Sequence, residues 1–324
     1  MEEDRKLTFF SKRRLKRQFA EWASVFRPGS EADYFGGVES MPPFDLKKGD
    51  EFCPVTAWWL AELCRLAYTP NHIEKNRRRF QGRPERMQIL EGRTSFREVH
   101  SVHKLGNHAA IFVWKDESGK EATVLCFRGT SKTRQWIMNA IFRPHRWKRF
   151  RMPDQAEGCF VHSGFYVLFK KLWPKVITEL EVLPRPWIFT GHSLGGALAT
   201  IAGMVAGPDA VYTFGSPKIG NQAMAESLRA YRLFRVVNSM DLVPGLPVPR
   251  DRLGEKNFAH SVPWIHFDES GKLEEIPSVP IERVPLLLKE AVEDLSRPPD
   301  WLLDHRVGEY CRKLRKVAQD SLLD

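Results

Sequence analysis

The chain has 324 residues, of which 42% are hydrophobic and 28% are charged. This length and composition are typical of a globular protein with a large core, and no apolar run reaches the roughly 18 residues of a transmembrane helix. The 50 basic and 40 acidic side chains give a net charge of +10, which favours contact with an anionic membrane, nucleic acid or acidic substrate.

The N-terminal region opens with the charged segment Met1–Lys6 and has no apolar stretch of signal-peptide length. The five cysteines are scattered and form no C-x-x-C pair, so we expect reduced thiols and no metal site. These features predict a cytoplasmic or peripheral-membrane location, and secretion by a non-standard route is not excluded.

Residues 1–50 are expected to form a basic N-terminal arm, and residues 51–324 a single domain. Within the arm, four apolar residues follow helical spacing among lysines and arginines: Leu15, Phe19, Trp22 and Phe26. Such a basic amphipathic helix either docks its apolar face on the domain, which we favour, or lies on an anionic membrane.

The domain begins with a predicted helix over 56–68, followed by strands over 97–105, 109–115 and 122–127. From there, helices and strands alternate, with helices at 165–183, 194–205 and 221–231 and strands at 187–190, 210–214 and 233–237. A hairpin is expected within 258–276, and two helices, at 284–295 and 308–318, close the chain. This alternation predicts an α/β fold with a mostly parallel central sheet and helices on both faces.

The segment Thr190–Gly196 fits the G-x-S-x-G nucleophile elbow of α/β-hydrolases. It lies between an apolar, β-prone run and an alanine- and leucine-rich helix, which is the strand–turn–helix context that the motif requires. Ser193 is therefore the predicted nucleophile. The alternative is that the segment is a glycine-rich turn that contains a serine by coincidence.

A nucleophilic serine needs a histidine base and an orienting carboxylate, which follow it in the order acid, then histidine, in this fold class. Asp241 fits the acid because it comes just after the predicted strand 233–237, where a loop begins. The other downstream aspartates fit less well: Asp209 starts a strand, Asp251 lies in a polar loop, and Asp268 lies in the hairpin.

Three histidines remain downstream of the elbow, and they are His260, His266 and His305. His260 and His266 belong to the predicted hairpin, whereas His305 precedes the last helix, where a loop can pass over the sheet. Position alone leaves the base undecided. For the oxyanion hole, the N–H of Leu194 is one donor, and Thr130, in the glycine turn after strand 122–127, is the expected second donor.

Several separated segments resemble the class 3, or fungal-type, lipases of the α/β-hydrolase superfamily. The matching segments are Phe127–Thr130 with Trp136, Val161–Phe165, Gly191–Gly196, Val237–Asn238 with Asp241–Pro244, and Asp304–His305 before Tyr310. The resemblance covers roughly residues 50 to 315. It implies that Ser193 is the nucleophile, His305 the general base and acid, Asp241 the orienting carboxylate, and Thr130 and Leu194 the oxyanion hole.

By this resemblance, the protein is a cofactor-free carboxylic ester hydrolase, a lipase that acts on acylglycerols. The alternative is a phospholipase A1 or glycolipid acyl hydrolase on anionic lipids, and a more distant one is a basic nucleic-acid-binding protein. No nucleic-acid fold signature accompanies the basic stretches, so no nucleic-acid partner is expected. The oligomeric state is not predicted.

Family lipases carry a lid after the oxyanion loop, which here corresponds to about 134–151. The expected lid and substrate-binding residues are Trp136, Ile137, Ile141, Phe142 and Trp147. Basic residues among them favour peripheral contact with a lipid surface, including an anionic one. The alternative is an ordinary surface helix whose aromatic side chains pack down on the domain.

Overall fold

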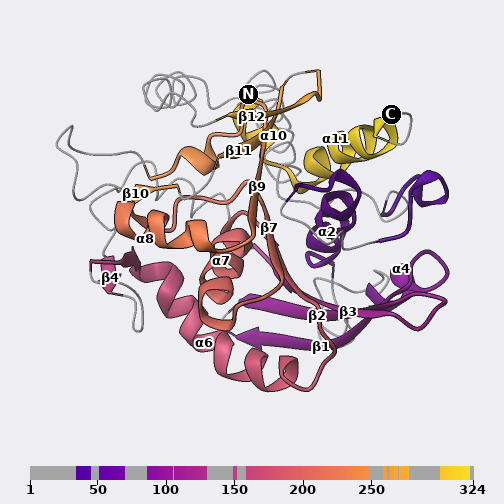
Figure 1. Cartoon of the computed structure of the whole chain (residues 1–324), viewed down its shortest axis with the longest axis horizontal. Coiled ribbons are helices and arrows are strands. Elements are labelled where there is room, and N and C mark those ends of the chain that lie inside the picture. Colours follow the sequence, from indigo (N-terminus) through magenta and orange to yellow (C-terminus); the bar gives the residue numbers. More distant parts are fainter. Residues whose placement is uncertain are drawn as a thin grey trace, which may run out of the picture.

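An eight-stranded sheet forms the centre of the protein in the computed structural model (Figure 1). The structure describes residues 34–44, 51–69, 86–104, 106–129, 149–151, 158–247, 258–260, 263–268, 270–276 and 300–321. The strand order is β1-β2-β3-β6-β7-β9-β11-β12. The strands are β1 (Phe96–Lys104), β2 (Asn107–Lys115), β3 (Glu121–Phe127), β6 (Trp187–His192), β7 (Ala210–Phe214), β9 (Leu233–Asn238), β11 (Trp264–Phe267) and β12 (Leu273–Ile276).

The five strands from β3 to β11 run parallel, and the pairs at the two sides of the sheet are antiparallel. Because the parallel strands end at one edge, the loops that follow them meet there. The mixed but mostly parallel sheet confirms the predicted fold class.

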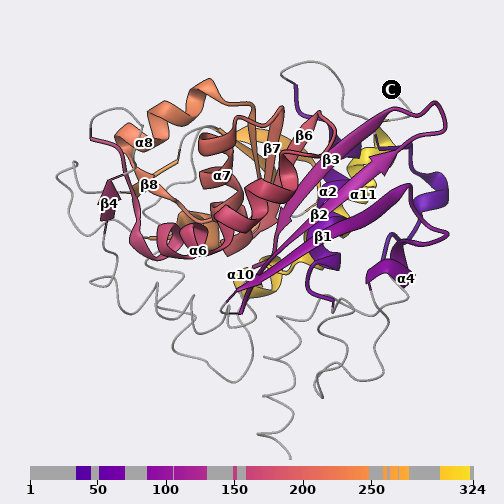
Figure 2. The ribbon, with the colours of Figure 1, turned by 90° about the horizontal axis from the view of Figure 1, so that it is seen from below.

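Helices cover both faces of the sheet, as Figures 1 and 2 show. On one face lie α2 (Pro54–Leu66) and α11 (Val307–Asp320), which pack with alternate strand residues such as Phe112, Val124 and Ile188. On the other lie α6 (Ser163–Leu180) and α7 (Leu194–Ala206), which pack with the intervening residues Ile111, Leu125 and Phe189. The period-two alternation of the central strands therefore supplies two cores, one on each face.

Smaller elements surround this frame. They are α4 (Arg86–Leu90), α8 (Gln222–Ser227), α10 (Asp300–Asp304), the 3-10 turns at Val38–Ser40, Leu228–Ala230 and Val243–Gly245, and a four-stranded sheet of order β10-β8-β5-β4. The strands of that second sheet are β10 (Phe258–Ala259), β8 (Gly220–Asn221), β5 (Phe160–His162) and β4 (Arg149–Arg151).

The second sheet corrects the predicted hairpin over 258–276. Only β11 and β12 pair as a hairpin, whereas β10 leaves the main sheet and pairs with β8. A two-residue strand has no periodicity that a sequence could reveal, so its partner is decided by tertiary packing.

Part of the predicted N-terminal arm packs into the core. Tyr34, Phe35 and Phe44 are each 1% exposed and belong to the cluster that includes α2. The division into an arm over 1–50 and a domain over 51–324 remains a proposal. The amphipathic helix expected around 15–26 and the helix expected at 284–295 lie outside the described residues. Within the part that is described, no helix combines the length and apolarity required to cross a bilayer.

Gly195 brings the start of α7 against the end of β3. A Cβ at this position would lie 2.0 Å from the carbonyl oxygen of Phe127, a backbone atom that cannot rotate away. We predict that Gly195→Ala lowers the free energy of unfolding by about 3 kcal/mol, because the sheet and helix must separate. Urea unfolding followed by circular dichroism measures this change.

Gly308→Ala is the matched control, since a Cβ there meets nothing within 4 Å in helix α11. It should raise the free energy of unfolding by about 0.5–1 kcal/mol. Equal stability of Gly195→Ala and the wild type would contradict the close approach of α7 and β3.

Candidate active site

Ser193 occupies a sharp turn between β6, which ends at His192, and α7, which begins at Leu194. Its backbone has φ of 59° and ψ of −128°, a region that non-glycine residues rarely adopt. The Ser193 N–H donates to the carbonyl of Phe214 at 2.9 Å, which ties the turn to the end of β7. The predicted strand–turn–helix elbow is present, with the serine raised at the carboxyl edge of the sheet.

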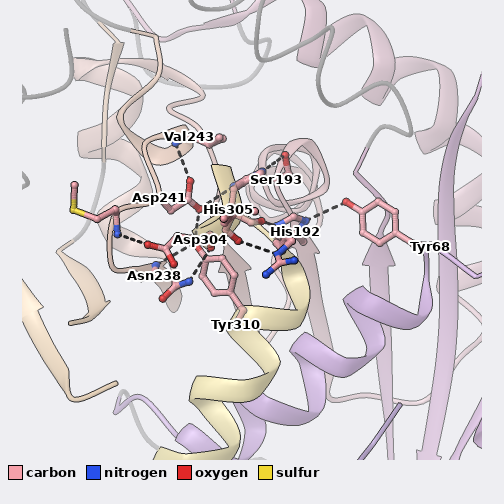
Figure 3. Close-up of polar contacts among 12 residues, drawn as sticks. Tyr68, His192, Ser193, Asn238, Asp241, Val243, Asp304, His305 and Tyr310 are labelled. Carbon is pink, nitrogen blue, oxygen red and sulfur yellow. Dashed lines mark hydrogen bonds and ion pairs between the residues drawn. The ribbon is translucent and has the colours of Figure 1, made fainter. Parts of the chain in front are cut away.

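Ser193, His305 and Asp241 form one chain of hydrogen bonds (Figure 3). The Ser193 Oγ lies 2.9 Å from His305 Nε2, and His305 Nδ1 lies 2.8 Å from Asp241 Oδ2. The exposed fractions of the three residues are 0%, 2% and 4%, so little water competes for these contacts. The structure thus brings together three residues that are 48 and 64 positions apart in the sequence.

The Asp241 carboxylate accepts three hydrogen bonds. Its Oδ1 accepts from the Val243 N–H at 2.9 Å, and its Oδ2 accepts from His305 and, at 2.6 Å, from the Tyr310 hydroxyl. The Tyr310 oxygen also accepts from the Asn238 N–H at 3.1 Å. Burial and the neighbouring carboxylate raise the pKa of Tyr310 well above its usual range, so the phenol remains a donor.

Sequence reasoning placed Tyr310 only in the terminal motif and gave it no role. The sequence offers little indication of a polar role for Tyr310, because a tyrosine within a predicted helix usually belongs to the core.

His305 lies in the turn between α10 and α11, and contacts from β9 and its following loop hold this turn. The Asn238 side-chain amide donates to the Asp304 carbonyl at 2.8 Å, and the Met240 N–H donates to the Asp304 carboxylate at 3.0 Å. Burial raises the pKa of Asp304. The loop that carries Asp241 and the turn that carries His305 are therefore joined by contacts that involve the backbone, as well as by the side chains of these two residues.

Gly215 follows β7 directly beneath these side chains, with φ of +58°. A Cβ there would lie 2.7 Å from Asp241 Oδ2 and 3.0 Å from both His305 Nδ1 and the Tyr310 hydroxyl. A side chain at this position would displace the hydrogen-bond chain. This requirement cannot be recognised from the sequence, because it arises from three segments that are distant along the chain.

The other predicted site residues are only partly described. Leu194 is the first residue of α7, where a helix offers N–H groups without intrahelical partners and the positive end of its dipole. Thr130 lies outside the described residues. The expected lid residues also lie outside them, namely Trp136, Ile137, Ile141, Phe142 and Trp147.

The rejected candidates make contacts elsewhere. His266 Nε2 lies 3.1 Å from the Ser239 carbonyl, and His260 Nε2 lies 2.5 Å from the Pro244 carbonyl. Asp209 pairs with Arg185 at 3.1 Å, and Asp268 accepts from the backbone of its own turn. In the described part of the chain, no group of three or more His, Cys, Asp or Glu side chains is arranged to hold a metal ion.

Comparison with known proteins gives a sequence match at this site. Residues 124–250 match the class 3 lipase family. A secreted mono- and diacylglycerol lipase A of Penicillium cyclopium is 35% identical over 138 residues, which cover 39% of this chain and 43% of that protein. A secreted mono- and diacylglycerol lipase 1 of Fusarium solani is 31% identical over 160 residues, which cover 46% of each chain. The chain thus spans slightly less than half the length of these relatives.

Solved structures share the fold. A fungal lipase aligns with a TM-score of 0.52 at 22% identity, over 68% of this chain and 84% of that chain. A deletion mutant of the Rhizomucor miehei lipase propeptide complex aligns with a TM-score of 0.51 at 21% identity, over 76% and 77%. The fold is that of the α/β-hydrolases, with a serine at its nucleophile elbow. Over residues 124–250, the chain is similar to the class 3 lipase family of that superfamily.

The comparison also corrects the expected location. The relatives from Penicillium and Fusarium are named secreted lipases, which contradicts the prediction of a cytoplasmic or peripheral-membrane protein. That prediction rested on thiol number and N-terminal composition, which are indirect signals.

The Tyr310 hydroxyl provides a test of how the Asp241 side chain is held. We predict that Tyr310→Phe lowers the free energy of unfolding by about 1–3 kcal/mol, because it leaves the buried Asn238 N–H without its acceptor and Asp241 without one donor. Urea unfolding measures the loss. In Tyr231→Phe, the control, only a 3.3 Å bond to the Met204 carbonyl is removed, and the loss should be below about 1 kcal/mol. Equal losses in the two variants would contradict the role of Tyr310.

Two buried histidines should make the free energy of unfolding depend on pH. Burial lowers the pKa of His108 and of His192 well below 6.5, so the folded protein keeps both rings neutral. Below about pH 6.5, the two rings bind protons when the protein unfolds. The free energy of unfolding is therefore highest above that pH and decreases on acidification. Each ring contributes a slope of about 1.4 kcal/mol per pH unit below 6.5.

Urea unfolding at pH 7.5 and pH 5.5 measures this effect, because ordinary carboxylates titrate at lower pH. In His108→Gln, the slope should be smaller by about 1.4 kcal/mol per pH unit. A wild-type protein that becomes more stable between pH 6.5 and 5.5 would show that these histidines are charged in the folded state.

Proposed function

We propose that the protein is a carboxylic ester hydrolase, a lipase that acts on acylglycerols through a covalent acyl-enzyme. The observation that carries this proposal is the hydrogen-bonded chain Ser193–His305–Asp241 at the elbow, with distances of 2.9 and 2.8 Å. A serine hydroxyl is a poor nucleophile alone, and this arrangement supplies the base that activates it.

In the proposed first step, Ser193 Oγ attacks the ester carbonyl while His305 Nε2 takes the hydroxyl proton. The carboxylate of Asp241 accepts the Nδ1–H of His305, which leaves Nε2 free to act as the base. The tetrahedral intermediate collapses as His305 returns the proton to the leaving alkoxide, and the alcohol departs. A water molecule, deprotonated by the same nitrogen, then attacks the acyl-serine and releases the carboxylic acid.

The negative oxygen of each tetrahedral intermediate needs fixed donors. We assign these to the N–H of Leu194, at the start of α7, and to Thr130. A donor of this kind contributes about 3–4 kcal/mol of transition-state stabilisation.

The three donors to Asp241 support its role as the orienting group. The Val243 N–H and the Tyr310 hydroxyl fix the rotation of its carboxyl group. An oriented carboxylate holds the imidazole in one tautomer throughout the cycle.

The class of substrate is supported by the relatives, which are named mono- and diacylglycerol lipases. Because the matched segment covers under half of those proteins, the acylglycerol substrate is proposed for this chain. The proposed lid at about 134–151, with its aromatic and basic residues, would contact the lipid surface.

Ser193→Ala tests the chemistry. With a p-nitrophenyl ester as substrate, this variant should lower kcat by at least about 10³-fold, because no other group replaces the nucleophile. Ser227→Ala on α8, where the hydroxyl only caps the Met224 carbonyl, should keep wild-type kcat. Substantial ester hydrolysis by Ser193→Ala would refute the assignment.

A substrate panel in the same assay separates the lipid classes. We expect faster hydrolysis of mono- and diacylglycerols than of anionic phospholipids at equal surface concentration. The reverse preference would replace the acylglycerol lipase with the phospholipase A1 alternative.

A further inference from the structure

His192, the residue before Ser193, connects the hydroxyl of the half-buried Tyr68 to the backbone of His305, two groups that the proposed chemistry does not otherwise use (Figure 3). Its Nδ1 lies 3.1 Å from the hydroxyl of Tyr68, and its Nε2 lies 2.7 Å from the backbone carbonyl oxygen of His305. The residue is 5% exposed. It therefore joins the end of α2 to the turn that carries the proposed base.

The hydrogens in this chain can be assigned from the chemistry of the partners. A carbonyl oxygen only accepts, so His192 Nε2 must carry the proton that it donates to His305. Burial and the neighbouring His305 lower the pKa of His192, which keeps the ring neutral and leaves Nδ1 without a proton. Nδ1 then accepts from Tyr68, whose pKa is raised by burial, so that the phenol stays protonated.

The carbonyl of His305 lies in the turn between α10 and α11, where helix ends leave carbonyl groups that need partners. The carbonyl of the preceding residue, Asp304, is held from β9 by Asn238. The His192 ring holds the next carbonyl, that of His305, from β6. Two successive peptide groups of the turn are thus fixed by side chains from two different strands.

His305 therefore makes two hydrogen bonds to the consecutive residues His192 and Ser193. Its side chain contacts Ser193 at 2.9 Å, and its backbone contacts His192 at 2.7 Å. A displacement of about 1 Å between reacting groups can cost 10²-fold in rate, so a fixed backbone has a direct effect on proton transfer.

We propose that His192, held in its Nε2–H tautomer by Tyr68, is a positioning residue that fixes the backbone of His305 against Ser193. This inference rests on the proposed function, because positioning has a rate effect only if His305 is the base. Tyr68 extends the connection to the oxyanion side, since a Cβ on Gly129 would lie 2.2 Å from its hydroxyl. One chain of contacts through Tyr68 and His192 therefore links the segment before Thr130, the elbow and the turn that carries His305.

A purely packing role is the competing explanation. The His192 ring lies 4.7 Å from the His305 ring and 5.9 Å from the Tyr310 ring, measured between centroids. Filling that space would need only an apolar side chain of similar size. Holding the carbonyl needs a donor at the position of Nε2, which the side-chain amide of glutamine can supply and leucine cannot.

The experiment compares His192→Gln, His192→Leu and Tyr68→Phe, with kcat and KM measured on a p-nitrophenyl ester. Tyr212→Phe is the control for loss of a buried tyrosine hydroxyl, since it lies in the core beside Phe234. We expect His192→Leu to lower kcat by about 10- to 100-fold with KM nearly unchanged. His192→Gln should recover to within about fivefold of the wild type, and Tyr68→Phe should fall between them. Wild-type kcat in His192→Leu, or equal losses in the leucine and glutamine variants, would overturn the proposal.

The tautomer of His192 is a second readout, and it does not depend on the activity of any variant. The ¹⁵N spectrum of histidine-labelled protein at pH 7 should show one neutral ring with the proton on Nε2 that changes when Tyr68 is replaced by Phe. A charged His192, or one with the proton on Nδ1, would overturn the inference. If the wild type hydrolyses no ester, the proposed function fails, while the spectrum still tests the hydrogen-bond chain by itself.

Discussion

The positive φ of Ser193 is the constraint on which the rest of the site depends. A residue with this backbone conformation is strained, and it persists only where its surroundings hold it. Here the Ser193 N–H is bound to Phe214, and Gly195 lets α7 approach the Phe127 carbonyl more closely than any side chain would permit. The turn therefore fixes the distance between β3, β6, β7 and α7, and so the edge of the sheet where the serine is presented.

A continuous set of polar contacts extends from this turn, and all its residues except the half-buried Tyr68 are buried. Toward one side it runs through His305 and Asp241 to Tyr310, and toward the other through His192 to Tyr68. In a low-dielectric interior, each partner that is missing would leave a costly unpaired group. The contacts that satisfy buried polar atoms thus also hold the proposed nucleophile, base and acid in position. The same hydrogen bonds therefore contribute to the stability of the fold and to the geometry of the proposed site.

The sequence predicted the features that depend on local pattern. The elbow at Ser193, the strand before Asp241 and the helix after His305 were all visible from spacing and from the residues that flank them. Long-range features could not be predicted this way. The absence of a side chain at Gly215 is required by three segments that meet only in the fold, and β10 pairs with β8 because of packing, not periodicity. The roles of Tyr310 and His192 follow from tautomers and burial, which one-dimensional spacing does not encode.

The most direct test of the account is covalent labelling of the serine. A p-nitrophenyl phosphonate ester imitates the tetrahedral intermediate and is attacked only by an activated nucleophile. Intact-mass and peptide analysis should find one adduct, on Ser193, which is absent in Ser193→Ala and forms much more slowly in His305→Ala. An adduct on another residue, or labelling of Ser193 at an unchanged rate without His305, would contradict the proposed triad.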